Sequence, residues 1–366
     1  MSNRSKQCFH IKAVGDIMLG DHPVCIGHGV RSLADHYGMD YVFERITSSL
    51  QGGDVVFGNL ESILSNTGYK EKSLVSCELR GRPQFSEVLA KKGFNVLSIA
   101  NNHIMQHGIG AFEDTINQLK IHNIKYVGKL LDGSSNVVEF TKSKLNIAFI
   151  GYSMRREKYY GKSLPYANVV SENYIEQIRN LKDKGKTVVV SLHWGEEYVN
   201  YPSRQQIEIA HKIIDHGASL ILGHHPHVLQ GIEKYRNGVI VYSLGNFIFD
   251  KWQRNPRETM LLDCFINQDG FVEYEITPIF INKKYQPCVA SEANSKIILN
   301  KLKRYTEYIY KIEKDNRLCK DYDKKAKYAY LRFRIESYMY FVRNIYRYKA
   351  WMIVQSLVRF IQRRVN

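Results

Sequence analysis

The stretch SLILGHHPHVLQG, residues Ser219–Gly231, decides the fold of this chain. Its apolar half ends at Gly223, and three histidines follow within four residues. A short apolar run bounded by glycine predicts a buried strand of a parallel sheet. Ligands of open α/β sheets bind just beyond the carboxyl ends of such strands, and histidine is a common metal ligand. The sequence therefore predicts a ligand site at His224, His225 and His227, with a simple polar turn as the alternative.

Outward from this stretch, residues 8 to 250 alternate short apolar segments with helical segments of roughly 10–15 residues. This alternation predicts βαβ units and a layered α/β domain. After Arg257 the pattern changes to two antiparallel strands that meet at a turn over residues 268–270. The predicted parallel strands span residues 9–16, 54–61, 95–103, 145–153, 187–195, 219–225 and 239–249. The predicted helices span residues 40–53, 83–93, 110–123, 172–185 and 203–217.

The composition is that of a globular protein with a hydrophobic core, since 44% of the residues are hydrophobic. The first residues, MSNRSKQCFHIKAVGD, hold no apolar segment of signal-peptide length, so we expect no signal peptide. No apolar run approaches the roughly 18 residues of a transmembrane helix. The six cysteines include no pair at short spacing, which argues against a disulfide scaffold and a structural zinc site. We therefore expect a cytoplasmic protein.

The positive charge is concentrated at the C-terminal end of the chain. The formal net charge is +16, and residues 301–366 hold 18 Lys and Arg against 6 Asp and Glu. We therefore predict a globular domain over residues 1–290 and a basic, aromatic-rich helical tail over residues 291–366. Basic charge alone also fits a nucleic-acid-binding protein. The body shows no RNA-recognition, KH or zinc-finger motif, so we expect no nucleic-acid partner.

The end of the tail reads as an amphipathic helix with basic residues beside its apolar stripe. Such a helix suits the interface of an anionic membrane, where each Lys or Arg adds about 1 kcal/mol. We therefore expect a peripheral contact with the inner membrane surface, where a membrane polymer synthase can lie. Packing of the stripe on the body or on a second protomer is the alternative. The stripe consists of Trp351, Val354, Val358, Ile361 and Val365.

Polar side chains follow the predicted strands of the body. Asp16 ends the first strand, Glu61 the second and Asn102 the third, while His193 ends a later one. Because the carboxyl ends of strands in an open α/β sheet form a common ligand-binding edge, we expect these side chains and the three histidines of residues 224–227 to converge. Their oxygen and nitrogen donors suit divalent Mn, Fe or Zn, and no cysteine joins them.

Six motifs occur in order along residues 9–252: GDIMLG, GNLES, ANNH, HWGEEY, GHHPHVLQG and YSLGNFIFD. Together they resemble the CapA (PgsA-like) capsule synthesis family, which is linked to poly-γ-glutamate production and is similar in fold to the calcineurin-like metallophosphoesterases. The resemblance implies a layered α/β sheet sandwich flanked by helices. In this chain the basic helical tail extends that fold at the C-terminus.

The resemblance also implies roles for individual residues. His103 matches the catalytic histidine of the metallophosphoesterases, and Glu196 or Glu197 can act as a base or substrate contact, with a solvated loop carboxylate as the alternative. One or two divalent ions are implied. The implied metal ligands are Asp16, Glu61, Asn102, His193, His225 and His227. The implied substrate contacts, or supports of the ligands, are Asn59, His224 and Asn246, for which an Asx-turn is the alternative at Asn246.

Three positions depart from the pattern of this fold. Met18 occupies the histidine position of the usual Asp-x-His motif, Glu61 replaces an aspartate, and Gln106 follows the NNH motif where many relatives have aspartate. The first departure bears on whether one or two ions bind. We expect a metal-dependent hydrolase or transferase of capsule or cell-surface polymer biosynthesis, acting on a polymer, glycan or phosphoester. A non-catalytic accessory subunit of a membrane polymer synthase is the alternative.

Overall fold

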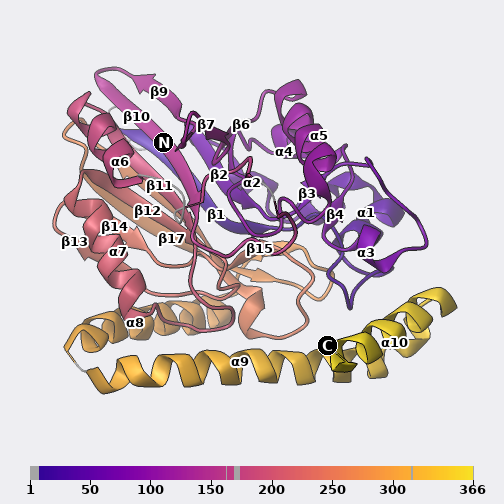
Figure 1. Cartoon of the computed structure of the whole chain (residues 1–366). Coiled ribbons are helices and arrows are strands. Elements are labelled where there is room, and N and C mark those ends of the chain that lie inside the picture. Colours follow the sequence, from indigo (N-terminus) through magenta and orange to yellow (C-terminus); the bar gives the residue numbers. More distant parts are fainter. Residues whose placement is uncertain (1–7, 162, 169–173, 315, 366) are drawn as a thin grey trace.

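Two β-sheets lie face to face at the centre of the computed structural model, which describes residues 8–161, 163–168, 174–314 and 316–365 (Figure 1). The larger sheet has the order β18 (Pro287–Val289), β17 (Val272–Ile281), β16 (Glu258–Ile266), β1 (Phe9–Ile17), β2 (Val55–Leu60), β5 (Val96–Ser98) and β6 (Lys125–Val127), and β15 (Asn246–Ile248) pairs with β1. The smaller sheet has the order β13 (Ile232–Tyr235), β14 (Gly238–Val241), β12 (Ala218–His224), β11 (Thr187–His193), β10 (Leu145–Ser153) and β9 (Val138–Lys142).

Helices cover the outer face of each sheet, as Figure 1 shows. On the larger sheet, α4 and α5 bury Phe85 and Phe112 against the outward side chains of β1 and β2. On the smaller sheet, α6 and α7 bury Ile178 and Ile207 against β10 and β11. The layered sandwich that the sequence predicts is therefore confirmed. The helices of the body are α1 (Val30–Tyr37), α2 (Thr47–Leu50), α3 (Leu74–Cys77), α4 (Phe85–Lys91), α5 (Gly108–Ile121), α6 (Tyr174–Asp183) and α7 (Arg204–Asp215).

The strand β1 shows why the sheets stack. Its alternate residues Phe9, Ile11 and Ala13 enter the core between the two sheets, whereas Val14 and Ile17 enter the core beneath the helices. Strand side chains alternate between faces, so a strand with helices on one side and a sheet on the other is apolar on both faces. This explains why the strands of the body read as almost continuous apolar runs.

The predicted strand over residues 239–249 is wrong, because the chain changes sheets in the middle of it. The first half is β14 in the smaller sheet, and the second half is β15, which pairs with β1 in the larger sheet. The crossing contains Gly245 at a φ of +74°, a conformation that side chains with a Cβ rarely adopt. A Cβ on Gly15 would also lie 1.9 Å from the carbonyl oxygen of Gly245. Apolar periodicity carries no signal for such a crossing.

The predicted helix over residues 40–53 is also wrong. The segment holds a 3₁₀-helix at Met39–Phe43 and the single turn α2 at Thr47–Leu50. The segment contains the β-branched residues Val42, Ile46 and Thr47, which lose side-chain freedom in a helix. The buried side chains of the segment instead pack into the core beneath α4.

The tail forms three helices that lie along one edge of the body (Figure 1). In α8 (Glu292–Lys314), Ile298 and Leu302 belong to the core between the sheets, so this helix is integral to the sandwich. The helix α9 (Asn316–Arg343) follows, and α10 (Ala350–Val365) ends the tail. The division into a domain of residues 1–290 and a separate tail stays a prediction. Among the described residues, no helix is both long and apolar enough to cross a bilayer.

The face by which α10 contacts the body is not its predicted apolar stripe. Met352 is buried beside Leu74, Gln355 bonds to the backbone of residues 72 and 74, and Arg359 pairs with Glu78. Of the stripe, Trp351 is half-buried, whereas Val354 and Val358 are 59% and 46% exposed. The side chains of Ile361 and Val365 lie outside the described part of the chain.

Asp263 on β16 gives a test of the pairing between β1 and β16. Its carboxylate accepts hydrogen bonds from His10 and Lys12, each at 2.7 Å. Burial works to raise the pKa of Asp263, but these two partners outweigh burial and lower it below its usual value of 3.8. A lowered folded pKa stabilises the protein fully above the unfolded pKa, and this contribution is lost as the pH falls through the folded value.

We therefore expect Asp263→Asn to lower the free energy of unfolding by about 1–2 kcal/mol at pH 7. The difference from the wild type should shrink at acidic pH, where the wild-type carboxylate is protonated too. Urea unfolding of both proteins at pH 7 and near pH 3 measures this. A difference that stays constant over this range would show that the loss is not electrostatic.

Candidate metal centre

The carboxylate of Glu61 lies at the centre of a buried cluster at the carboxyl edge of both sheets. Its Oε1 atom is 3.8 Å from Nε2 of His193 and 3.6 Å from Nε2 of His227. Asp16 at the end of β1 is 3.3 Å from Nδ1 of His227 and accepts a hydrogen bond from the backbone N–H of His225. Three groups of potential ligand atoms lie within 4.8 Å of one another: Glu61 with His193 and His225, Glu197 with His225 and His227, and Asp16 with Glu61 and His227.

The unsatisfied polar atoms of this cluster fit a bound cation. Among the described residues, neither oxygen of Glu61 and neither ring nitrogen of His225 has a hydrogen-bond partner, although both side chains are buried. Burial, and after it the carboxylate of Asp16, raise the pKa of Glu61 well above its usual range. Burying a carboxylate without a partner costs several kcal/mol. A divalent ion held by oxygen and nitrogen donors removes this cost, so the residues present fit a metal ion.

The turn after β12 aims two histidines back at the sheet edge. His225 and His227 have φ values of +94° and +58°, which are uncommon for residues other than glycine. Such strained conformations persist only where the surroundings hold them, and they gather at functional sites. Here the rings of His193 and His225 have centroids 4.7 Å apart. The turn predicted as a polar alternative is thus present, but its histidines point into the cluster.

Two buried amides, Asn59 and Asn246, bond to potential ligands from behind, and the buried ring of His224 lies beside them without a hydrogen bond among the described residues. The amide of Asn59 donates to Oδ1 of Asp16 at 2.9 Å, and Nδ1 of His224 lies 3.3 Å from the same atom. The Oδ1 atom of Asn246 lies 3.0 Å from Nδ1 of His227. Partners of this kind fix the ring orientation of a histidine ligand and leave its other nitrogen free for the metal. Their geometry favours support of the ligands over direct contact with substrate.

Asn102 and His103 follow β5 on the other side of Glu61. The Oδ1 atom of Asn102 accepts a hydrogen bond from Nε2–H of His193 at 2.7 Å, which places this oxygen beside a potential metal ligand. His103 has its Nε2 atom 3.9 Å from Glu61 and is in none of the three groups of potential ligand atoms. Its Nδ1 atom lies 2.9 Å from Oε1 of Gln106, so the ring donates there and presents Nε2 to the cluster.

Burial lowers the pKa of His103 to about 4. A histidine that acts as a general acid has to carry a proton that it can give to the leaving oxygen. At neutral pH the ring is instead neutral, with an acceptor nitrogen facing the cluster. The hydrogen bond to Gln106 and the nearby charge of Glu197 work to raise this pKa, but burial outweighs both. His103 can therefore act as a donor only after it has first accepted a proton.

The two glutamates after β11 have different surroundings. Glu197 is in one of the groups of potential ligand atoms, with His225 and His227. Burial works to raise its pKa, but the nearby side chains of His227 and Lys251 outweigh burial and lower it, which favours the charged carboxylate. Glu196 is half-exposed and pairs with Arg155 at 2.8 Å. The structure therefore brings Glu197 into the cluster and leaves Glu196 at its rim.

Sequence reasoning missed a buried lysine at this site. Lys251 is 2% exposed, and its Nζ atom bonds to the hydroxyl of Tyr198 at 3.0 Å. The same ammonium lies 4.6 Å from the ring centroid of Phe333, which belongs to α9 and stacks on Tyr198 at 4.3 Å. Only the position of Lys251, directly after the YSLGNFIFD motif, was available as a signal. The contact with α9 is invisible in the sequence.

Met18 and its neighbours do not replace the missing histidine ligand. Met18 is buried in a small apolar cluster with Leu79 and Phe249, and it is in none of the groups of potential ligand atoms. The carboxylate of Asp21 accepts hydrogen bonds from the backbone N–H groups of Gly27 and Ser32. This part of the chain therefore adds no ligand that would clearly complete a second metal position.

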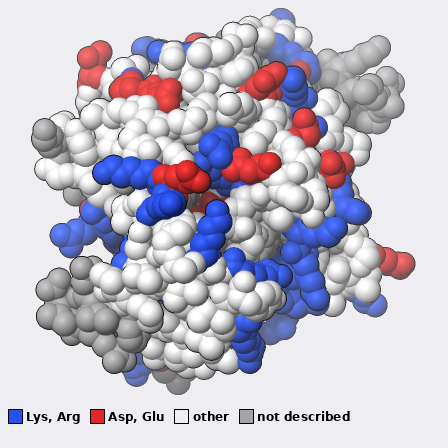
Figure 2. Space-filling model, turned by 90° about the vertical axis from the view of Figure 1, so that its right-hand side faces the viewer, with Lys and Arg blue, Asp and Glu red and all other residues white. Residues whose placement is uncertain are grey.

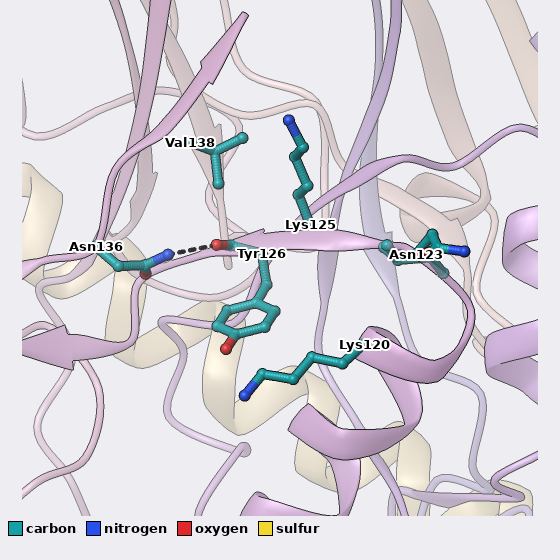
Figure 3. A pocket seen from close by; sticks show the side chains of 7 residues that line it. Lys120, Asn123, Lys125, Tyr126, Asn136 and Val138 are labelled. Carbon is teal, nitrogen blue, oxygen red and sulfur yellow. Dashed lines mark hydrogen bonds between the residues drawn. The ribbon is translucent and has the colours of Figure 1, made fainter.

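One hollow on the surface lies away from the cluster, and another adjoins it. Figure 3 shows a pocket of about 410 Å³ at the far end of α5, in which Asn136 donates to the carbonyl of Tyr126 at 2.7 Å. Its lining has no carboxylate or histidine. The second is a groove of about 790 Å³ that includes Glu196, Glu197 and residues of α9. The groove is therefore the hollow that leads to the potential metal ligands.

Comparison with known proteins gives a family match over most of the chain. The family model described as "Bacterial capsule synthesis protein PGA_cap" matches residues 10–251. The chain is 30% identical to the capsule biosynthesis protein CapA of Bacillus anthracis over 317 residues, which is 84% of this chain and 75% of that protein. It is also 30% identical to the PGA biosynthesis protein CapA of Bacillus subtilis (strain 168), over 86% of this chain and 82% of that protein.

A likeness to one solved structure is much weaker. The 5'-nucleotidase of Candida albicans SC5314 aligns with a TM-score of 0.40 and 10% identity, covering 81% of this chain and 57% of that one. At this level the likeness supports no statement about activity or substrate.

Substitution of a potential ligand tests whether the cluster binds a metal ion. We expect His225→Ala to weaken metal binding by about 100-fold or more, because loss of even a supporting residue costs 10–100-fold. The matched control is His36→Ala, which removes an exposed histidine of α1. The metal content of the purified proteins, measured by mass spectrometry after dialysis, checks this. Equal content in both variants would contradict a metal site at this cluster.

Proposed function

Because the chain belongs to the bacterial capsule synthesis (PGA_cap) family, we propose that it is a metal-dependent hydrolase or transferase of poly-γ-glutamate capsule or other cell-surface polymer biosynthesis. The observation that supports this most directly is the pair of buried, unsatisfied ligand groups, Glu61 and His225. A protein that used the fold only as a scaffold would gain stability by replacing them with apolar residues.

The residues of the cluster have different roles in such a reaction. Asp16, Glu61, Asn102, His193, His225 and His227 hold the ion, and Mn, Fe and Zn suit this donor set. When bound, a divalent ion supplies Lewis acidity that polarises a phosphoryl or carbonyl oxygen. The carboxylate of Glu197 adds a negative charge at the side of the cluster that faces the groove. Asn59, His224 and Asn246 keep the ligand atoms aligned.

His103 is the residue placed to move a proton. Its neutral ring accepts a proton at Nε2 from the attacking hydroxyl group and then returns it to the leaving oxygen. Gln106 holds the ring by its Nδ1 atom, so the proton-accepting nitrogen keeps its direction. Burial lowers the pKa of Lys251, and the nearby carboxylates of Glu197 and Asp250 work against this shift, so its amino group beside the cluster suits an anionic substrate group.

One observation favours the second candidate function, a non-catalytic accessory subunit of a membrane polymer synthase. Met18 replaces a histidine ligand and packs among apolar side chains, so the ligand set is smaller than that of a two-metal site. A single bound ion can serve catalysis or only stabilise the edge of the sheets. Bound metal without turnover would decide for the accessory role.

We also propose that the tail contacts an anionic membrane surface. The outward face of α9 exposes apolar side chains at spacings of three and four residues, and α10 adds Val354, Leu357 and Val358. In Figure 2, Lys and Arg dominate the charged side chains over the lower part of the molecule, where the tail lies. Apolar side chains flanked by cations suit an anionic interface, at which a synthase can meet this protein. The exposed residues of α9 are Leu331, Ile335, Met339 and Val342.

Replacing His103 tests the catalytic proposal. We expect His103→Ala to keep its bound metal and to lose about 10²–10⁴-fold of its turnover of a chromogenic phosphoester. The control is His216→Ala, at the end of α7 on the surface, which should match the wild type in both measurements. Wild-type protein that is loaded with Mn, Fe or Zn and hydrolyses no ester would instead support the accessory role.

A double substitution on α10 tests the membrane proposal. We expect Val354→Asp with Val358→Asp to reduce flotation of the full chain with anionic liposomes at low salt, because each apolar side chain is exposed and loses its insertion energy. The matched control is Ile121→Asp with Leu131→Asp, two exposed apolar residues of the body. If both double variants float as the wild type does, the tail does not bind membrane.

A further inference from the structure

The helix α9 is fixed against the candidate metal centre at two points. At its start, Tyr322 is buried, with its hydroxyl 3.4 Å from Oε1 of Gln206 on α7. Further along, Phe333 stacks on Tyr198 and on Trp252. These two anchors are eleven residues apart, which corresponds to about 16 Å of helix. The part of α9 between these two contacts is therefore held in place against the body.

Between the anchors, α9 forms one side of the groove that leads to the cluster. Ala326, Lys327 and Tyr330 line the groove from α9, and the opposite side includes the segment after β10 and the start of α7. Its floor holds Glu197, which belongs to a group of potential metal ligands. The volume of about 790 Å³ is in the range of ligand-binding pockets. A span of about 16 Å accommodates roughly five residues of extended chain.

The charges that line the groove favour an anionic occupant. Arg155 is paired with Glu196, and Arg204 with Glu208. Lys158 and Lys327, on opposite sides, have exposed ammonium groups for which no ion pair is present among the described residues. The carboxylates of Asp323 and Glu197 also line the groove, but Glu197 belongs to a group of potential metal ligands, so a bound ion would offset its charge. At the inner end, buried Lys251 adds a further cation beside the cluster.

We propose that α9 completes the substrate site, and that the groove between α9 and the body holds an anionic chain end beside the candidate metal centre. This inference rests on the proposed function and adds to it the place and class of the substrate. The anionic groups are carboxylates or phosphates, which Lys158 and Lys327 attract in the same way. The aromatic ring of Tyr330 gives the chain between these groups a surface to lie on.

The test compares two charge reversals on the same helix. Lys327 lines the groove, whereas Lys324, one turn earlier and exposed, does not. Binding of a fluorescent γ-linked glutamate oligomer to the full chain is measured by anisotropy at fixed ionic strength. We expect Lys327→Glu to weaken binding about five- to tenfold, since a nearby charge is both lost and reversed, and Lys324→Glu to change it less than about twofold.

Each outcome of this experiment tests anion binding in the groove, and none of them depends on catalytic activity. A polyphosphate of similar charge, used in parallel, shows which anion the groove prefers, and selective loss with Lys327→Glu for either oligomer supports the site. Equal loss in both variants means attraction by net charge only and overturns the proposal, as does a wild type that binds neither oligomer. Unchanged metal content shows that Lys327→Glu is folded. Because binding is read without turnover, failure of the catalytic proposal leaves this result independent.

Discussion

The structure depends on one electrostatic constraint: Asp16 and Glu61 place two carboxylates side by side, both fully buried, at the carboxyl edge of the larger sheet. Repulsion and desolvation make this arrangement unfavourable by itself. Histidines from the smaller sheet approach the same point, from the end of β11 and from the turn after β12. The larger sheet thus contributes carboxylates to the centre and the smaller sheet contributes histidines. The packing of the two sheets against each other brings these ligands together.

The place where the chain crosses from one sheet to the other is set by the backbone of two glycines. Gly15 lies so close to Gly245 that no Cβ fits, and the chain crosses from one sheet to the other at that place. The crossing brings Asn246 into register with Asp16, and Asn246 then holds His227. The strained turn at His225 and His227 completes the arrangement. Rigid elements on both sides of the centre explain how strained conformations are held there.

The layers of the fold and the place of the potential ligands at the sheet edge could be predicted from the sequence, because both follow from local patterns. Apolar runs that end in polar residues locate β1, β2, β11 and β12 and the edge at which they meet. The same periodicity failed over residues 239–249, where the change of sheet depends on glycine geometry and on distant backbone. It also failed for Lys251 and Phe333, whose contact joins the last body motif to the tail. Contacts between residues so far apart in the sequence produce no periodic pattern within either segment.

The return of the tail to the start of the chain has a consequence for biosynthesis. The hydroxyl of Tyr348 bonds to the carbonyl of Val24 at 2.5 Å, and Gln355 bonds to Lys72 and Leu74. At 5–20 residues per second, the ribosome needs roughly 5–19 s to pass from Asp250 to Arg343, the last residue of α9. During this interval the potential ligands of the cluster have been synthesised, but α9 is incomplete. The nascent body therefore exposes Tyr198 and its acidic edge until α9 has been synthesised, and only then can the centre reach its enclosed form.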